Sequence, residues 1–200
     1  MSPVPITIMV YKLDELDAKA RQRAVSVYAD LTASDWSPDM DDDWRTIAGF
    51  LGFEVEGKFA WDTGPGGYCV FVGGWKAERV DLAKLTEYAP QDAELHAIGA
   101  GMMGLALKWP TATALIRTVG SRSPSFYIDL DDGSGSDGEP CEDNDRDALD
   151  SLANRFGAWM RKQLHEEYAY QTSEAQVIES IEANDYLFHR DGSIYHAQKG

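Results

Sequence analysis

The stretch "FEVEGKFAWDTGPGGYCVFVGGW", residues 53–75, constrains the fold most, because it has the pattern of a β-hairpin. Its first half alternates apolar or small residues with charged ones, and "DTGPGG" supplies the Gly and Pro residues of a turn. A short hairpin joins only antiparallel strands. Its second half contains "YCVFV", whose unbroken apolar character favours a strand that is buried on both faces.

The other predicted elements do not alternate between strand and helix as a parallel sheet requires. Strands are predicted over residues 6–11, 111–120 and 125–130, and a small C-terminal hairpin is predicted to turn at "RDGS". Helices are predicted after Asp17, over residues 43–51 until Gly52, from Asp92, from near Asp145 and from Ser173. This order predicts an α+β fold, with a mainly antiparallel sheet packed with several helices, in a single domain covering residues 1–200.

Three of these helices carry apolar residues at helical spacing, which gives each helix a face directed at a core. Asp17 and Asp92 are expected to cap their helices, and Ser173 is expected to form a capping box with Gln176. Glycines at 99, 101 and 104 either weaken the third helix or permit close packing. The inward residues are expected to be Ala20, Ala24, Val27, Leu31, Leu95, Ile98, Met102, Leu105, Leu149, Leu152, Phe156, Met160 and Leu164.

The charge of the chain restricts its partners. There are 34 acidic and 18 basic residues, which gives a net charge of −16. Such an excess repels nucleic acid and anionic membranes and attracts basic protein surfaces. Acidity that serves only solubility is the alternative. We expect no direct contact with nucleic acid or membrane, and a protein with a basic surface as the partner.

Two further features bear on the compartment. No apolar run approaches the ~18 residues that span a bilayer, and no basic residues precede the N-terminal apolar run as they do in a signal peptide. Two cysteines are too few for a disulfide framework. These features favour a cytoplasmic protein.

Acidic residues concentrate between 129 and 147, where nine carboxylates accompany one base. The spacing does not fit a calcium-binding EF-hand loop, because Ser stands where the sixth position needs Gly. A flexible loop, a weak cation site and an acidic recognition surface are the alternatives. We predict a partner-binding surface that joins this segment to a second acidic run and comprises Asp35, Asp39, Asp41, Asp42, Asp43, Asp129, Asp131, Asp132, Asp137, Glu139, Glu142 and Asp143.

Aromatic residues form a second candidate surface, because Trp and Tyr are enriched at protein interfaces. The predicted contact residues are Trp36, Trp61, Tyr68 and Trp75, and a position in the core is the alternative for most of them. A chain that uses this surface would be an antitoxin-like protein-binding module.

Patterns of known catalytic and metal sites are missing from the sequence. "GPGG" lacks the Lys of a phosphate-binding P-loop, and His165 has no second His one turn away as a zinc-binding helix requires. No nucleophile elbow occurs. We therefore predict no catalytic, metal or cofactor-binding residues and no cofactor. An enzyme on a small metabolite, with Asp62, His96 or Glu167 near a cleft, is a third alternative.

Several stretches together resemble an uncharacterised family of tailed-phage and prophage proteins. They are "YKLDELDAKARQRAVSVY", the aromatic–glycine hairpin, "LTEYAPQDAELHAI" and "LHEEYAYQTSEAQVIESIEANDYLFHRDG". The C-terminal stretch is the most specific of them. At the hairpin, "DTGPGGY" stands where family members carry a Gln-Gly-Asp-Gly element, which puts any activity of that element in question here.

The resemblance implies a phage origin, and some members of the family are labelled as antitoxins. Together with the acidity, it leads us to expect a phage-encoded accessory protein that binds and inhibits a host protein. Such an anti-defence inhibitor would act by presenting carboxylates in place of nucleic-acid phosphates.

Overall fold

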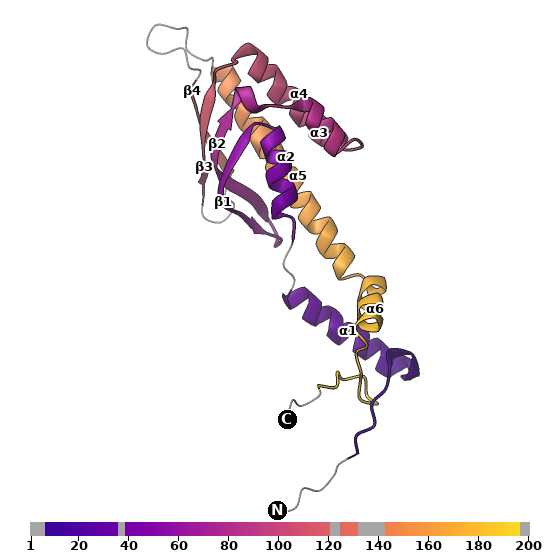
Figure 1. Cartoon of the computed structure of the whole chain (residues 1–200). Coiled ribbons are helices and arrows are strands. Elements are labelled where there is room, and N and C mark those ends of the chain that lie inside the picture. Colours follow the sequence, from indigo (N-terminus) through magenta and orange to yellow (C-terminus); the bar gives the residue numbers. More distant parts are fainter. Residues whose placement is uncertain (1–6, 36–38, 121–124, 132–142, 197–200) are drawn as a thin grey trace, which may run out of the picture. The chain divides into compact units, whose positions relative to one another are not determined.

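The computed structural model describes residues 7–35, 39–120, 125–131 and 143–196 (Figure 1). The chain divides into two compact units, residues 1–37 with 166–200 (unit 1) and residues 38–165 (unit 2). Helices and an antiparallel sheet both occur, which confirms the predicted α+β class.

Unit 2 is built on a four-stranded antiparallel sheet with the strand order β1-β2-β3-β4. The predicted hairpin forms β1 (Phe53–Asp62) and β2 (Tyr68–Lys76). The two later strands are β3 (Thr113–Val119) and β4 (Ser125–Asp131). Every strand therefore pairs with its neighbour in sequence, which is the simplest topology that an antiparallel sheet can have.

The helices of unit 2 lie on one side of this sheet (Figure 1). They are α2 (Asp41–Phe50), α3 (Leu82–Tyr88), α4 (Ala93–Lys108) and the unit 2 part of α5 (Asp143–Gln171), with a short 3₁₀ turn, η2 (Ala77–Arg79), after the hairpin. The ring of Phe71 lies 4.9 to 6.2 Å from the rings of Phe53, Phe126 and Phe156, so aromatic contacts join three strands to α5.

Helix α5 presents the face that its sequence predicts. Leu149, Leu152, Phe156, Met160 and Leu164 are all buried. Its glycine, Gly157, packs against the sheet, where an added Cβ would lie 2.8 Å from the carbonyl oxygen of Cys69. The close approach of helix and strand at this point therefore depends on the absence of a side chain.

The N-caps of α4 and α6 (Glu174–Ala183) are those that we predicted. Asp92 accepts a hydrogen bond from the backbone N–H of Leu95, and Ser173 accepts one from Gln176. The capping box expected at Ser173 is incomplete, because the backbone N–H of Ser173 donates to the carbonyl oxygen of Tyr170 and not to Gln176. Gly52 follows the end of α2 with a φ of +90°, in the left-handed conformation expected of a helix-ending glycine. Close packing is confirmed for Gly99 and Gly101 but not for Gly104, which has open space around it.

Unit 1 consists of η1 (Leu13–Glu15), α1 (Ala18–Asp35), the C-terminal end of α5, α6 and the C-terminal segment. Asp17 caps α1 by accepting a hydrogen bond from the N–H of Ala20. Leu31 is 45% exposed, so the prediction that it faces the core is wrong. The buried core consists of Leu13, Leu16, Ala20, Ala24, Val25, Val177, Ile181 and Phe188.

Two predicted boundaries differ from the structure. Residues 7–10 form no strand, and only Tyr11 makes an isolated bridge, to Phe188. Within the predicted acidic loop, residues 129–131 belong to β4 and residues 143–147 to α5, while residues 132–142 lie outside the described part. A helix whose first turn contains acidic residues is stabilised by them, which explains why α5 begins inside the acidic segment.

Candidate interaction surface

The predicted acidic residues occupy several separate places. Asp39 precedes α2, and Asp41, Asp42 and Asp43 form its first turn. Asp129 is exposed on β4, and Asp143 begins α5 with its side chain 98% exposed. Trp36, Asp132, Asp137, Glu139 and Glu142 lie outside the described residues, as do the side chains of Asp35 and Asp131.

The described members of the two acidic runs do not meet on unit 2. Asp41 lies close enough to Cys69, at the start of β2, for its charge to act on that thiol. Asp129 pairs with Leu115, which pairs with Gly74, five residues further along β2. At the usual rise of a strand this is a separation of roughly 17 Å along the sheet. The starts of α2 and α5 also lie toward opposite ends of the sheet (Figure 1).

The described members of the predicted aromatic surface do not form one exposed patch either. Trp75 is only 1% exposed, and its Nε1 donates to the carbonyl oxygen of Leu51 at 3.0 Å. A side chain in that position contacts the core, so its prediction as a partner contact is wrong. Trp61 and Tyr68 are half-buried near the hairpin turn.

The residues considered for catalysis serve local structure. Asp62 accepts the N–H of Gly64 in the hairpin turn, His96 contacts the carbonyl of Ala89, and Glu167 accepts a hydrogen bond from Gln171. Burial, together with the charge of Asp41, raises the pKa of Cys69 to about 12, which keeps that thiol protonated at neutral pH. Among the described residues, no group of His, Cys, Asp and Glu has the geometry to hold a metal ion.

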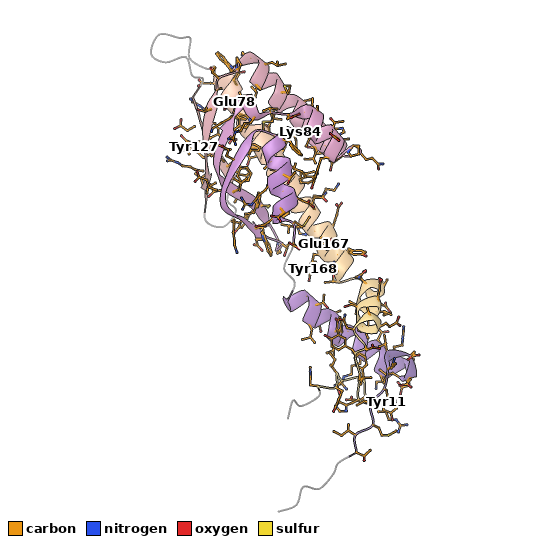
Figure 2. The ribbon with its side chains drawn as sticks, in the orientation of Figure 1. Tyr11, Glu78, Lys84, Tyr127, Glu167 and Tyr168 are labelled. Carbon is orange, nitrogen blue, oxygen red and sulfur yellow. The ribbon has the colours of Figure 1, made fainter. Side chains whose placement is uncertain are left out.

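A different surface stands out, the sheet face that carries no helix, which we call the outer face. Side chains alternate between the two faces of a strand. On β3 and β4 the buried positions include Ala114, Ile116, Phe126 and Ile128. The positions between them therefore point away from the helices, as Tyr127 does in Figure 2.

Four exposed apolar or aromatic residues of the outer face surround one arginine, Arg117. Leu115 and Val119 precede and follow it by two residues on β3, and they are 42% and 47% exposed. On the neighbouring strands, Tyr127 pairs with Arg117 directly, and Val72 lies level with it on β2. Val72 and Tyr127 are 42% and 52% exposed. We call these four residues and Arg117 the outer-face cluster.

Charged residues flank the outer-face cluster on both edge strands. Glu54 of β1 pairs with Lys76 at 3.0 Å and with Arg79, and the Lys76 hydrogen bond is the main cause that lowers the pKa of Glu54. Glu56 of β1 and Asp129 of β4 make no side-chain hydrogen bond or ion pair with a described residue. The margins of the outer face are therefore acidic and partly unneutralised.

Side chains from the helices occupy part of each sheet edge. Arg45 of α2 donates to the outward carbonyls of Val55, at 3.2 Å, and of Gly57. On the opposite edge, Asn154 of α5 accepts the N–H of Phe126 at 3.4 Å. Backbone groups at the sheet edges that are already bonded cannot pair with a strand of another protein. The outer face is therefore more accessible to a partner than the two sheet edges are.

Sequence reasoning missed the outer-face cluster entirely. The signal was present in "TATALIRTV", where small and apolar residues at 112, 114 and 116 alternate with mixed residues at 113, 115 and 117. This alternation is typical of a strand with one open face.

Comparisons with protein-family models, with curated proteins and with solved structures find no match to this chain. Among the described residues, no helix combines the length and the apolar character that crossing a bilayer requires.

Proposed function

We propose that this chain acts by binding another protein, and that the outer face of the unit 2 sheet is its contact surface. The observation that carries the proposal is the outer-face cluster, in which four exposed apolar or aromatic side chains surround Arg117. Tyr and Arg are the residue types most often found at the energetic centre of protein interfaces. Apolar side chains gathered on one open face are typical of interaction sites.

The resemblance to phage proteins and the net charge of −16 suggest the role of the binding. In this proposal, the chain is a phage-encoded inhibitor of a host protein that presents a basic surface. Its acidic margins speed the encounter with such a partner, while the apolar cluster supplies the affinity.

A nucleic-acid mimic is the less favoured form of the proposal. Mimicry needs a continuous array of carboxylates, and the described carboxylates lie at separate places on unit 2. The two forms differ in salt dependence, because an array of exposed charges loses affinity steeply as salt rises, whereas apolar contacts do not.

Two leucines provide a matched test of the proposed surface. Leu115 lies in the outer-face cluster, and Leu107 is exposed on α4, outside it. Changing either to Glu adds the same charge to an exposed position. We expect a host protein captured by the tagged wild-type chain to be retained by Leu107→Glu and lost by Leu115→Glu, with circular dichroism confirming that both variants fold. Equal capture by the two variants would contradict the proposal.

A further inference from the structure

The arginine at the centre of the outer-face cluster restricts the chemistry of a partner. The side chain of Arg117 makes no hydrogen bond or ion pair with a described residue. A protein that covers the four surrounding side chains also covers this guanidinium group and removes its water. Burying a charge without a partner is costly, so the covering surface must supply acceptors. A carboxylate suits it best, because it accepts two parallel hydrogen bonds from a guanidinium group.

The size of the outer face restricts the shape of the partner. β3 has seven residues and the sheet has four strands. At usual strand dimensions the face is roughly 24 Å long and 19 Å wide, or about 450 Å². Stable interfaces between whole folded proteins bury about 800 Å² of accessible surface on each partner, so this face suits a smaller binding element. One α-helix, about 10 to 12 Å wide, would run the length of the face with about 16 residues.

The acidic margins complete the description of the partner. Glu56 lies level with Arg117 on β1, and Asp129 is two residues beyond Tyr127 on β4. Both carboxylates lack an ion-pair partner among the described residues. They lie on either side of the cluster, where the flanks of a helix laid along the strands would pass, so basic residues on those flanks would neutralise them.

Building on the proposed function, we infer that the outer face binds one amphipathic α-helix of a partner protein. Arg117 contacts a carboxylate in the middle of the apolar side of that helix, and Glu56 and Asp129 contact basic residues on its flanks. Arg117 then determines specificity, because a helix with a neutral or basic residue at the central position leaves the guanidinium group unpaired.

Three synthetic helical peptides test this inference. They share 16 residues with a leucine face and lysines on both flanks, and they differ only in the central residue of the leucine face, which is Glu, Gln or Lys. Titration into the ¹⁵N-labelled chain is followed by NMR. We expect the Glu peptide to shift the amides of Leu115, Arg117 and Tyr127 and to bind about tenfold more tightly than the Gln peptide.

Charge reversal supplies the second arm of the test. In Arg117→Glu, we expect the order to invert, with the Lys peptide binding more tightly than the Glu peptide. The control is Arg190→Glu, an equal change of charge at an exposed position of unit 1, which should keep the wild-type order. Equal affinity for the three peptides, or no binding of any, would overturn the inference. So would a dimer in sedimentation experiments that Arg117→Glu dissociates, since the occupant would then be a second copy.

The two Leu variants separate failure of this inference from failure of the proposed function. If no peptide binds but Leu115→Glu alone still loses the host protein, the surface is correct and the helix chemistry is wrong. If Leu115→Glu and Leu107→Glu capture the same protein equally, the surface itself is wrong.

Discussion

Two buried tryptophans of unit 2 differ in one hydrogen bond. Trp44 and Trp75 are each 1% exposed. The indole N–H of Trp75 donates to the carbonyl oxygen of Leu51, whereas that of Trp44 has no acceptor among the described residues. A buried donor without an acceptor costs free energy, and so does a buried acceptor whose donor has been removed.

We therefore expect Trp75→Phe to destabilise the protein by about 1–3 kcal/mol more than Trp44→Phe. Both substitutions remove the same atoms from a fully buried site, so each is the control for the other. Urea unfolding followed by circular dichroism measures the two free energies of unfolding. Equal losses would show that the hydrogen bond to Leu51 contributes nothing net.

At the scale of single residues, the sequence predicted the features that depend on contacts between residues close together in the chain. The caps at Asp17, Asp92 and Ser173 were predictable because a side-chain oxygen bonds a backbone N–H three residues away. The position of Trp75 was not, because its burial depends on contacts with residues far away in the sequence. Composition alone cannot distinguish an interface tryptophan from a core tryptophan.

The close contact between α5 and β2 depends on a glycine of α5, Gly157. An alanine Cβ at position 157 would lie 2.8 Å from the Cys69 carbonyl oxygen and 3.0 Å from the ring of Phe126. Backbone and a packed ring cannot give way easily, so the helix would have to move outward. At Gly104 of α4, by contrast, no atom lies within 4 Å of an added Cβ.

Replacing these two glycines by alanine should consequently have opposite effects on the stability of the protein. Gly104→Ala should stabilise the protein by up to about 1 kcal/mol, because alanine favours the helix and nothing opposes it. Gly157→Ala should destabilise it despite the same gain in helix propensity. Thermal unfolding of the two variants checks the signs, and a stabilising Gly157→Ala would mean that α5 does not approach β2 this closely.

At the scale of elements, periodicity predicted the hairpin, the strands of residues 111–120 and 125–130, and the buried face of α5. It was only partly right at "YCVFV", which we predicted to be buried on both faces, because Cys69, Val70 and Phe71 are buried but Val72 is not. Val72 is 42% exposed because no described helix covers the outer face. An apolar run cannot reveal which neighbours cover it, and the candidate surface was missed for the same reason.

At the scale of the whole molecule, the chain has a large excess of acidic residues. One of its carboxylates, that of Asp145, is buried, and its negative charge stabilises the folded state. Asp145 of α5 accepts hydrogen bonds from the Lys108 ammonium at 2.7 Å and from the Trp109 indole at 3.0 Å. The Lys108 hydrogen bond is the main cause that lowers the pKa of Asp145, and burial opposes it. A carboxyl whose pKa is lower in the folded state stabilises that state above its unfolded pKa.

This stabilisation should disappear as the pH falls from about 4, the ordinary pKa of an aspartate, through the lower pKa of the folded state. We expect Asp145→Asn to be less stable than the wild type at pH 7, with the difference shrinking at pH 3. Urea unfolding at both values measures it. Asp129→Asn, at an exposed and unpaired carboxylate, is the control and should match the wild type at pH 7.

The division into two units has a consequence for biosynthesis. Unit 2 is one continuous segment, so the ribosome supplies everything it needs in a single stretch, whereas unit 1 combines residues 1–37 with residues 166–200. At about 5–20 residues per second, α1 emerges and then waits roughly 7 to 28 seconds for α6. During that interval Val177, Ile181 and Phe188, which complete the unit 1 core, have not been synthesised, so the apolar side chains of α1 stay partly exposed and available to chaperones.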